Sequence, residues 1–243
     1  MKGYKPVISF DQDVAQGYHN FQRGDESAAV TFLAQIAGPG PALELGIGAG
    51  RIALPLAARG IRVDGIELSP AMVDQLRTEP AGDQLSVTIG DFADVQVPGT
   101  YRLIFVVFNT LFNLLTQEDQ VRCFENVAAH LTEDGSFVVE TYTPDFLYRL
   151  RNNQYVDAEA IEVDAVRLDV LQHYPARQMI EESHVSLSQA GVHLNPIVQR
   201  YAWPSELDLM ARIAGLHLKN RWGGWNQEPF DSSSSAHVSV YGR

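Results

Sequence analysis

A glycine-rich turn near residue 46 is the segment of this chain best suited to chemistry. Residues 42–51 read Ala-Leu-Glu-Leu-Gly-Ile-Gly-Ala-Gly-Arg, a short apolar stretch followed by Gly46, Gly48 and Gly50. Glycines let the backbone approach a ligand closely and adopt dihedral angles closed to other residues. A helix expected over 51–59 offers unpaired N–H groups to a negatively charged group. The segment therefore predicts a loop that binds a nucleotide-type cofactor.

The spacing of these glycines distinguishes two classes of cofactor. Dinucleotide-binding loops follow the pattern G-x-G-x-x-G, in which the third glycine allows close helix packing. Counted from Gly46, Arg51 stands where that third glycine belongs. Glu44 can receive a cationic group, directly or through water, but repels a pyrophosphate. A ligand with an ammonium and a carboxylate fits this loop best, and a NAD-dependent oxidoreductase is the less favoured alternative.

A second acidic residue follows at the distance that a nucleoside ligand requires. Residues 61–67 read as a strand that ends in Glu67, 21 residues after Gly46, where a carboxylate can bind ribose hydroxyls. Ser69 and Pro70 then mark the start of a helix, with Ser69 as the N-cap and Pro70 at the first helical position.

Residues 44–50 resemble the E/D-x-G-x-G-x-G signature of the class I S-adenosylmethionine-dependent methyltransferases. The resemblance covers roughly residues 40–142, and Glu67 and Asp91 follow in the order of that family. It implies S-adenosylmethionine as cofactor, with Glu67 on the ribose and Asp91 on the adenine amino group. The residues expected to bind the cofactor are Glu44, Gly46, Gly48, Gly50, Arg51, Glu67, Leu68, Met72, Asp91, Phe92 and Asn109.

The order of expected elements is typical of a parallel α/β sheet, because strands and helices alternate from residue 43 to residue 140. The family resemblance adds an antiparallel hairpin at the edge of the sheet, over 216–222 and 236–241. We therefore expect a Rossmann-like, doubly wound sheet of seven strands. Expected strands lie over 43–45, 61–67, 101–108 and 133–140 and within 85–92, and expected helices over 28–37, 51–59, 117–131 and 203–215.

Residues 143–202 interrupt this alternation. Apolar and acidic residues alternate at 161–164 and 167–171, and 179–187 and 192–201 also read as strands, with a turn at 189–191. We expect three antiparallel strands added to the main sheet. The chain is then one domain, 1–243, in which 143–202 is a strand-rich insertion that covers the substrate.

Methyl transfer depends mainly on placing the nucleophile in line with the methyl group and on excluding water. A general base is needed only if the nucleophile must lose a proton, and no catalytic triad is evident in the sequence. The catalytic candidates are Asn109, His19 and His173, and the expected substrate residues are Tyr18, Glu140, Tyr142, Tyr201 and Trp203. For each of them a packing, turn or solvent-exposed role is the alternative.

Acidic residues concentrate between residues 157 and 182. They form either the solvated face of a small sheet or a pocket for a cationic amine, to which tryptophans would add. No histidine spacing typical of a metal site is present, so no metal is expected. The residues are Asp157, Glu159, Glu162, Asp164, Asp169, Glu181 and Glu182, with Trp203, Trp222 and Trp225 as the tryptophans.

The composition limits partners and location. The net charge of −12 over 243 residues disfavours a nucleic acid partner. The one cysteine, Cys123, fits a reducing compartment, and neither a signal peptide nor a membrane-length apolar run is present. We expect a cytoplasmic monomer or homodimer that methylates nitrogen, oxygen or carbon of a small molecule, of the natural-product or amine type. A cofactor-binding sensor without turnover is the alternative outside enzymes.

Overall fold

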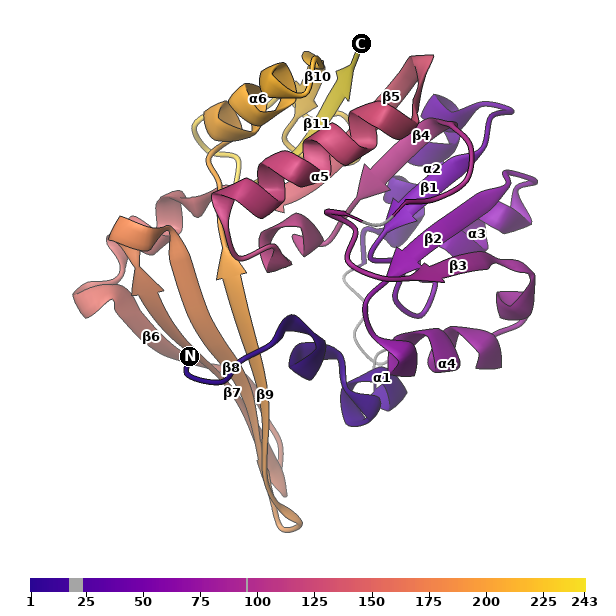
Figure 1. The fold of residues 1–243 in the computed structure, drawn as a ribbon. Helices are drawn as coiled ribbons and strands as arrows, with labels where there is room; N and C mark the ends of the chain where they lie inside the picture. The colour runs from indigo at the N-terminus through magenta and orange to yellow at the C-terminus, as the bar shows by residue number, and fades with distance from the viewer. Residues whose placement is uncertain (18–23, 95) are drawn as a thin grey trace.

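The computed structural model describes residues 1–17, 24–94 and 96–243 and contains two sheets (Figure 1). The larger sheet has seven strands in the order β10-β11-β5-β4-β1-β2-β3. Strands β1 to β5 are parallel, whereas β11 runs antiparallel to both β5 and β10. The predicted Rossmann-like sheet with an antiparallel edge is confirmed. Its strands are β1 (Ala42–Leu45), β2 (Val63–Glu67), β3 (Ser86–Ile89), β4 (Tyr101–Val106), β5 (Leu131–Tyr142), β10 (His217–Trp222) and β11 (Ala236–Gly242).

Helices cover both faces of this sheet because its central strands are apolar on both sides. Along β4, Ile104 packs in one buried cluster with α5 and α6, and Phe105 packs in another with α2 and α3. No helix in the described ranges is long and apolar enough to cross a membrane. The α-helices are α1 (Gln12–Gly17), α2 (Glu26–Ala37), α3 (Ala53–Ala58), α4 (Pro70–Thr78), α5 (Gln117–His130) and α6 (Pro204–Ile213).

Local signals place the helix starts. Ser69 caps α4, since its Oγ accepts the amide hydrogen of Met72 at 3.3 Å, and Pro70 is the first helical residue. Helix α3 begins two residues later than expected, at Ala53, because residues 46–52 form the turn that leaves β1.

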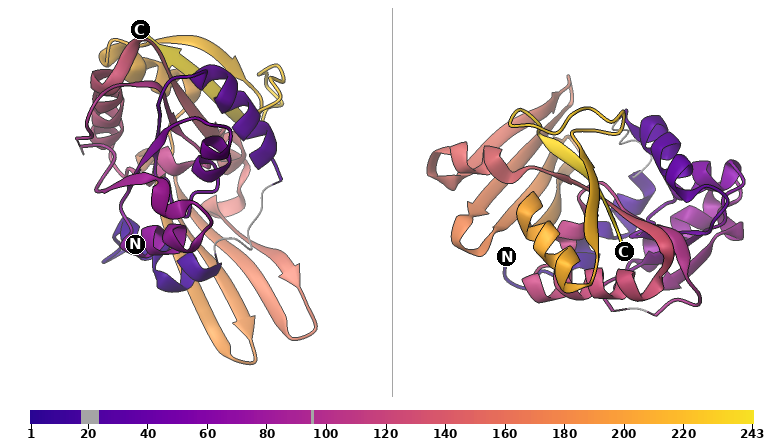
Figure 2. Two further views of the ribbon diagram at one scale, coloured as in Figure 1. Left: turned by 90° about the vertical axis from the view of Figure 1, so that its right-hand side faces the viewer. Right: turned by 90° about the horizontal axis from the view of Figure 1, so that it is seen from above.

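The second sheet corrects the expectation of three strands added to the main sheet. Its four antiparallel strands, in the order β6-β7-β8-β9, form a sheet of their own that extends as two hairpins (Figure 2). The additional strand, β6, lies at an edge and is largely exposed, so its sequence lacks a buried apolar repeat. Residues 162–164 are a turn rather than a strand. The strands are β6 (Gln154–Ile161), β7 (Ala165–Tyr174), β8 (Met179–Ser188) and β9 (Gly191–Arg200).

The smaller sheet is anchored to the main body by its base. Leu171 and Ile180 are buried in the same cluster as α5, α6 and β5. Tyr201, directly after β9, joins them, and its amide hydrogen bonds to the carbonyl of Gln178 at 2.9 Å. One face of the smaller sheet therefore looks toward the carboxyl ends of the main strands.

Candidate active site

The glycine turn after β1 forms one wall of a partly open cavity, whose empty space is about 610 Å³ when the adjoining solvent is included. Gly46 and Gly48 line it, with φ of 73° and 54°, in the left-handed region that favours glycine. A Cβ on Gly46 would lie 2.6 Å from Cγ2 of Thr110. Gly50 does not line the cavity, and its Cβ would collide with Leu76, so this glycine allows α4 to pack on the turn.

Glu67, at the end of β2, holds the turn in place. Its Oε2 accepts the amide hydrogen of Gly48 at 2.8 Å, and its Oε1 accepts that of Ser69 at 2.9 Å. Burial raises the pKa of this carboxyl, while the backbone hydrogen bonds oppose that rise. Each carboxylate oxygen has a second lone pair, and Glu67 lines the cavity. The side chain thus supports the turn and still offers acceptors to a ligand.

Glu44, in the middle of β1, is buried and does not line the cavity. Burial raises its pKa well above the usual value, although the Ala53 amide stabilises the charge. Its Oε2 has no hydrogen-bond partner within the described part of the chain. A buried acceptor without a partner is costly, so this oxygen suits a donor carried by a ligand or a bridging water.

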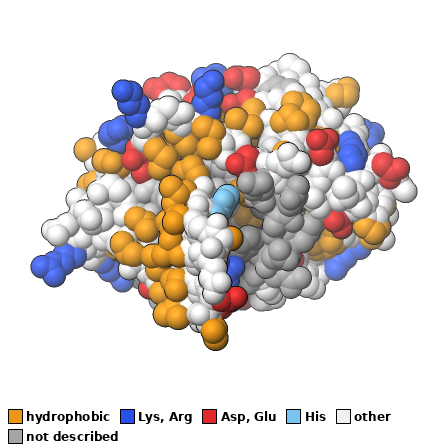
Figure 3. Space-filling model, turned by 90° about the horizontal axis from the view of Figure 1, so that it is seen from below, with side chains coloured by type: hydrophobic (Ala, Val, Ile, Leu, Met, Phe, Trp, Pro, Cys, Tyr) orange, Lys and Arg blue, Asp and Glu red, His pale blue; other side chains and the backbone are white. Residues whose placement is uncertain are grey.

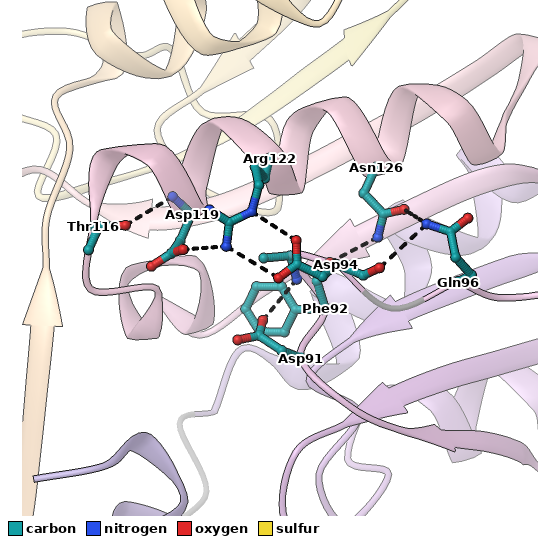
Figure 4. A network of polar contacts seen from close by, with 9 residues as sticks. Asp91, Phe92, Asp94, Gln96, Thr116, Asp119, Arg122 and Asn126 are labelled. Carbon is teal, nitrogen blue, oxygen red and sulfur yellow. Dashed lines mark hydrogen bonds and ion pairs between the residues drawn. The ribbon is translucent and has the colours of Figure 1, made fainter.

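The opposite wall is the loop after β3, which is held by α5 (Figure 4). Asp94 accepts two hydrogen bonds from Arg122, at 2.8 and 3.2 Å, and Asn126 donates to the carbonyl of Phe92 at 3.2 Å. Asp91 and Phe92 line the cavity, and the exposed Asp91 binds the Ala93 amide through Oδ1. The loop is therefore a fixed platform with one carboxylate directed to the ligand.

Seven of the eleven predicted cofactor residues line the cavity, and they are Gly46, Gly48, Glu67, Leu68, Met72, Asp91 and Phe92. Glu44, Gly50, Arg51 and Asn109 do not. Arg51 instead lies 5.2 Å from the ring centre of Phe108 and 3.6 Å from a carboxylate oxygen of Glu26. The cavity is completed by Pro6, Phe10, Thr110, Asn113 and Leu114, which the sequence analysis did not identify.

The N-terminal segment passes beside β9 (Figure 1) and contributes Pro6 and Phe10 to the cavity wall. Its helix η1 (Pro6–Phe10) is tied to β9 and to the start of α4: Ser9 donates to the carbonyl of Pro196 in β9 at 2.7 Å, and Ser69, the N-cap of α4, donates to that of Phe10 at 2.5 Å. The sequence carries no periodic signal for so short an element. Tyr18 and His19, which were predicted for this region, lie outside the described residues.

Asn109 acts as a connector at the end of β4. It has a positive φ of 63°, and its Oδ1 accepts the amide hydrogen of Tyr142 at 2.7 Å. Glu140 is buried and accepts the amide hydrogen of Phe108 at 2.6 Å. Both side chains thus hold the β4 loop against β5, which places Thr110 in the cavity wall.

Tyr142 extends from β5 toward the smaller sheet. Its ring packs edge-on against Phe112 at 5.0 Å, and its hydroxyl donates to Oε1 of Gln199 in β9 at 3.4 Å. Burial raises the pKa of this tyrosine, and the charge of Glu182 adds to the rise. Tyr142 therefore connects the β4 loop to the smaller sheet, although it does not line the cavity.

Three other predicted site residues gather at the base of the smaller sheet. His173 and Tyr201 are fully buried, with His173 Nε2 at 2.8 Å from the Tyr201 hydroxyl. Tyr148 bonds the same hydroxyl at 2.9 Å and packs on Trp203 at 5.8 Å. Burial lowers the pKa of His173. The structure does not bring this group to the cavity, where it was expected to act as a base or to line the acceptor site.

An acidic cluster occupies the inner face of the smaller sheet. Tyr155 donates to Asp169 at 2.8 Å and approaches Glu182 at 3.4 Å, and His184 Nδ1 lies 3.3 Å from Asp169 and 3.4 Å from Glu159. Ligand atoms of Glu159, Asp169 and His184 lie within 4.8 Å of one another. We call these five residues the acidic cluster.

The charges of this cluster are linked. Burial, followed by the charge of Asp169, raises the pKa of Glu182 to about 7. The hydrogen bond to Asp169 raises the pKa of His184 despite its burial. Burial opposes the ionisation of Asp169, but hydrogen bonds from His184 and Tyr155 outweigh it and lower the pKa. The cluster therefore holds a carboxyl that changes its protonation state near neutral pH.

Comparisons with known proteins agree with this geometry. A family model described as a methyltransferase domain matches residues 42–135. The CcbJ methyltransferase from Streptomyces caelestis has a similar structure, with a TM-score of 0.92, 37% identity, and coverage of 98% of this chain and 99% of that one. The cypemycin N-terminal methyltransferase of a Streptomyces species is 25% identical over 205 residues, or 83% of this chain and 82% of that protein. CalS10, an amino pentose methyltransferase from Micromonospora echinaspora, shares the fold, with a TM-score of 0.69, 18% identity, and coverage of 94% of this chain and 95% of that one.

The fold and the glycine turn define a Rossmann-like enzyme that binds a nucleoside cofactor. The identity to CcbJ over nearly the whole length identifies the family. The chain belongs to the class I S-adenosylmethionine-dependent methyltransferases, and its cofactor is S-adenosylmethionine. Neither the NAD-dependent oxidoreductase nor the sensor without turnover is favoured.

Proposed function

We propose that this methyltransferase acts on an amine nitrogen of a small organic molecule, and that the acidic cluster binds this amine. The observation that carries the proposal is the contact of Tyr142 with Gln199, which lies on the face that carries Glu182. The amide of Tyr142 also binds Asn109, the residue before Thr110 in the cavity wall. An amine held there would meet carboxylates on one side and the cavity on the other.

The residues of the cavity fit the cofactor. The remaining lone pairs of Glu67 would accept hydrogen bonds from the ribose hydroxyls, and Asp91 would accept one from the adenine amino group. The unpartnered Oε2 of Glu44 would receive the ammonium of the methionine part, through water because Glu44 does not line the cavity. Bound there, the cofactor supplies a methyl group on a positively charged sulfur.

An amine must be neutral before it can act as a nucleophile. Most alkyl amines enter as ammonium ions, which a tyrosine ring and carboxylates attract. Glu182 can accept the proton, since its pKa of about 7 lies near that of a base operating at neutral pH. Asp169 and His184 would stabilise the charges that remain. Catalysis then rests on orientation, desolvation and removal of one proton.

Charge also argues for the class of substrate. The net charge of −12 opposes a phosphate backbone, so we expect no transfer to bulk DNA or RNA. The likeness to the cypemycin N-terminal methyltransferase supports nitrogen over oxygen or carbon. We also place the enzyme in the cytoplasm, because its single cysteine, Cys123, is buried and free.

The test is a methyl-transfer assay with isotope-labelled S-adenosylmethionine on amino sugars, cyclic secondary amines, peptide N-termini, matched alcohols, DNA and RNA. We expect label in the amines only, and loss of most of that label in Glu182→Gln. Glu162→Gln, in the exposed turn after β6, is the matched control. Transfer to alcohols alone, or equal rates in Glu182→Gln and the control, would contradict the proposal.

A further inference from the structure

The outer face of the smaller sheet is apolar and exposed to solvent. Residues that lie directly opposite one another on neighbouring strands point to the same face, so the register defines three rows of side chains across the four strands. The rows are Val156-Val170-Ser183-Pro196, Ala158-Leu168-Val185-Leu194 and Ile161-Val166-Leu187-Val192. We call this surface the outer face.

Exposure separates this surface from the core. Val156, Ile161, Val192 and Leu194 keep 67, 78, 66 and 60% of their surface in contact with solvent. None of the side chains in the three rows is charged, and all of them belong to the described residues. Hydrophobic side chains also gather beside the ends of the hairpins in Figure 3. Contiguous apolar surface of this kind is rare on monomers and marks interaction sites.

The opposite face of the same strands has the reverse character. There Asp169 and His184 stand side by side, and the next row holds Leu171 and Glu182. A one-sided sheet of this pattern normally packs its apolar side on something and leaves its polar side to water. Here the polar side faces the substrate region, so the apolar side needs another partner.

We propose that the outer face binds the outer face of a second copy of this chain, in a symmetric dimer with the two sheets packed face to face. Aligned packing of two sheets about 10 Å apart is a common arrangement. A two-fold interface is self-complementary, and this face is suited to it because two equal copies bring no like charges together.

The size of the outer face supports this occupant. Four strands about 4.8 Å apart and about five residues of about 3.3 Å each make a face of roughly 20 by 17 Å. Side chains make the accessible area larger than this projection, so two copies approach the lower bound of about 1,200 Å² for a specific interface. A lipid surface fits less well, because the net charge of −12 opposes anionic headgroups.

Sedimentation velocity over a series of concentrations tests the proposal with the full chain. The wild type is expected to sediment as a dimer, and the double variant Val192→Glu/Leu194→Glu as a monomer. His193→Glu is the control for position, since it places a glutamate on the same strand but on the opposite face. It is expected to remain a dimer.

Circular dichroism melting checks that each variant folds. If the double variant does not fold, Val156→Glu on β6 is a second variant that is expected to be a monomer. A wild type that has the mass of one chain at every concentration would overturn the proposal. So would a folded double variant that stays dimeric, or a His193→Glu variant that loses the dimer. Cofactor binding is measured in parallel, and its outcome does not bear on the interface.

Discussion

The Gly48 amide donates a hydrogen bond of 2.8 Å to Oε2 of Glu67, which ties the glycine turn to the end of the neighbouring strand. The two motifs of this family are therefore one structural unit. The acidic residue holds the glycine turn in shape, and the turn in return orients the carboxylate at the wall of the cavity. A change in either residue should affect both binding and local order.

Replacement of Glu67 by Ala should weaken binding of S-adenosylhomocysteine at least tenfold. Hydrogen bonds to a charged group contribute about 1.5–3 kcal/mol each, and a factor of ten corresponds to about 1.4 kcal/mol. Glu67→Gln, which keeps one acceptor oxygen, should weaken this binding less than Glu67→Ala does. Isothermal titration calorimetry measures both, and a change below twofold in Glu67→Ala would place the ribose elsewhere.

Gly48→Val should abolish cofactor binding. Its Cβ would stand 3.2 Å from Cε of Met72 beside the cavity, at a φ of 54° that disfavours any side chain. Gly60→Val is the matched control, because Gly60 also has a positive φ, 84°, but no heavy atom within 4 Å of its added Cβ. Both variants should melt at lower temperature, while calorimetry should detect binding only in Gly60→Val. Normal binding by Gly48→Val would remove the turn from the cofactor site.

The platform after β3 should depend on its anchor in α5. Arg122→Ala removes both hydrogen bonds to Asp94 and should loosen the loop that carries Asp91. We expect severalfold weaker cofactor binding with little loss of overall stability, because this ion pair is exposed. Arg149→Ala, which breaks the exposed pair with Asp145, is the control. Calorimetry and hydrogen exchange at residues 91–94 measure the effect, and equal affinity in both variants would contradict it.

The main sheet could be predicted from sequence because its signals are local. Apolar runs, the cap at Ser69 and the glycine turn each determine their own segment, and so β1 to β5 appear where expected. Seven of the residues predicted to bind the cofactor line one cavity, because the segments that follow the carboxyl ends of parallel strands meet at one edge of the sheet. Glu44 was read as near the ligand, but its side chain is buried and does not line the cavity.

The rest depends on contacts between distant segments. Pro6 and Phe10 enter the cavity only because Ser9 and Ser69 fasten the N-terminal segment to two elements far along the chain. The acidic residues of 157–182 divide between two faces according to register, which a one-residue shift would reverse. Leu171 and Glu182 therefore point inward, whereas Val170 points out, and no local pattern specified this.

The pH dependence of acceptor binding should follow Glu182. Below about pH 7 its carboxyl is protonated and holds an ammonium weakly, so the KM for the amine should fall as the pH rises through 7. Four side chains interact with the charge of this carboxyl: Tyr155, Asp169 and His184 on the smaller sheet, and Tyr142 from β5. In Glu182→Gln the KM for the amine should no longer change through pH 7, while Glu162→Gln should keep the change seen in the wild type.

Stability should fall as the pH rises, whereas the affinity for the amine should increase. The pKa of Glu182 is higher in the folded chain, about 7, than its ordinary value of 4.5, so the folded state binds the proton more tightly. The wild type should therefore lose stability as the pH rises from about 4.5 to about 7, relative to Glu182→Gln, which carries no charge there. Melting temperatures of both proteins across this range measure the difference. Parallel curves would show that folding does not raise the pKa of Glu182. A KM that does not change through pH 7 would remove Glu182 as the residue that binds the amine.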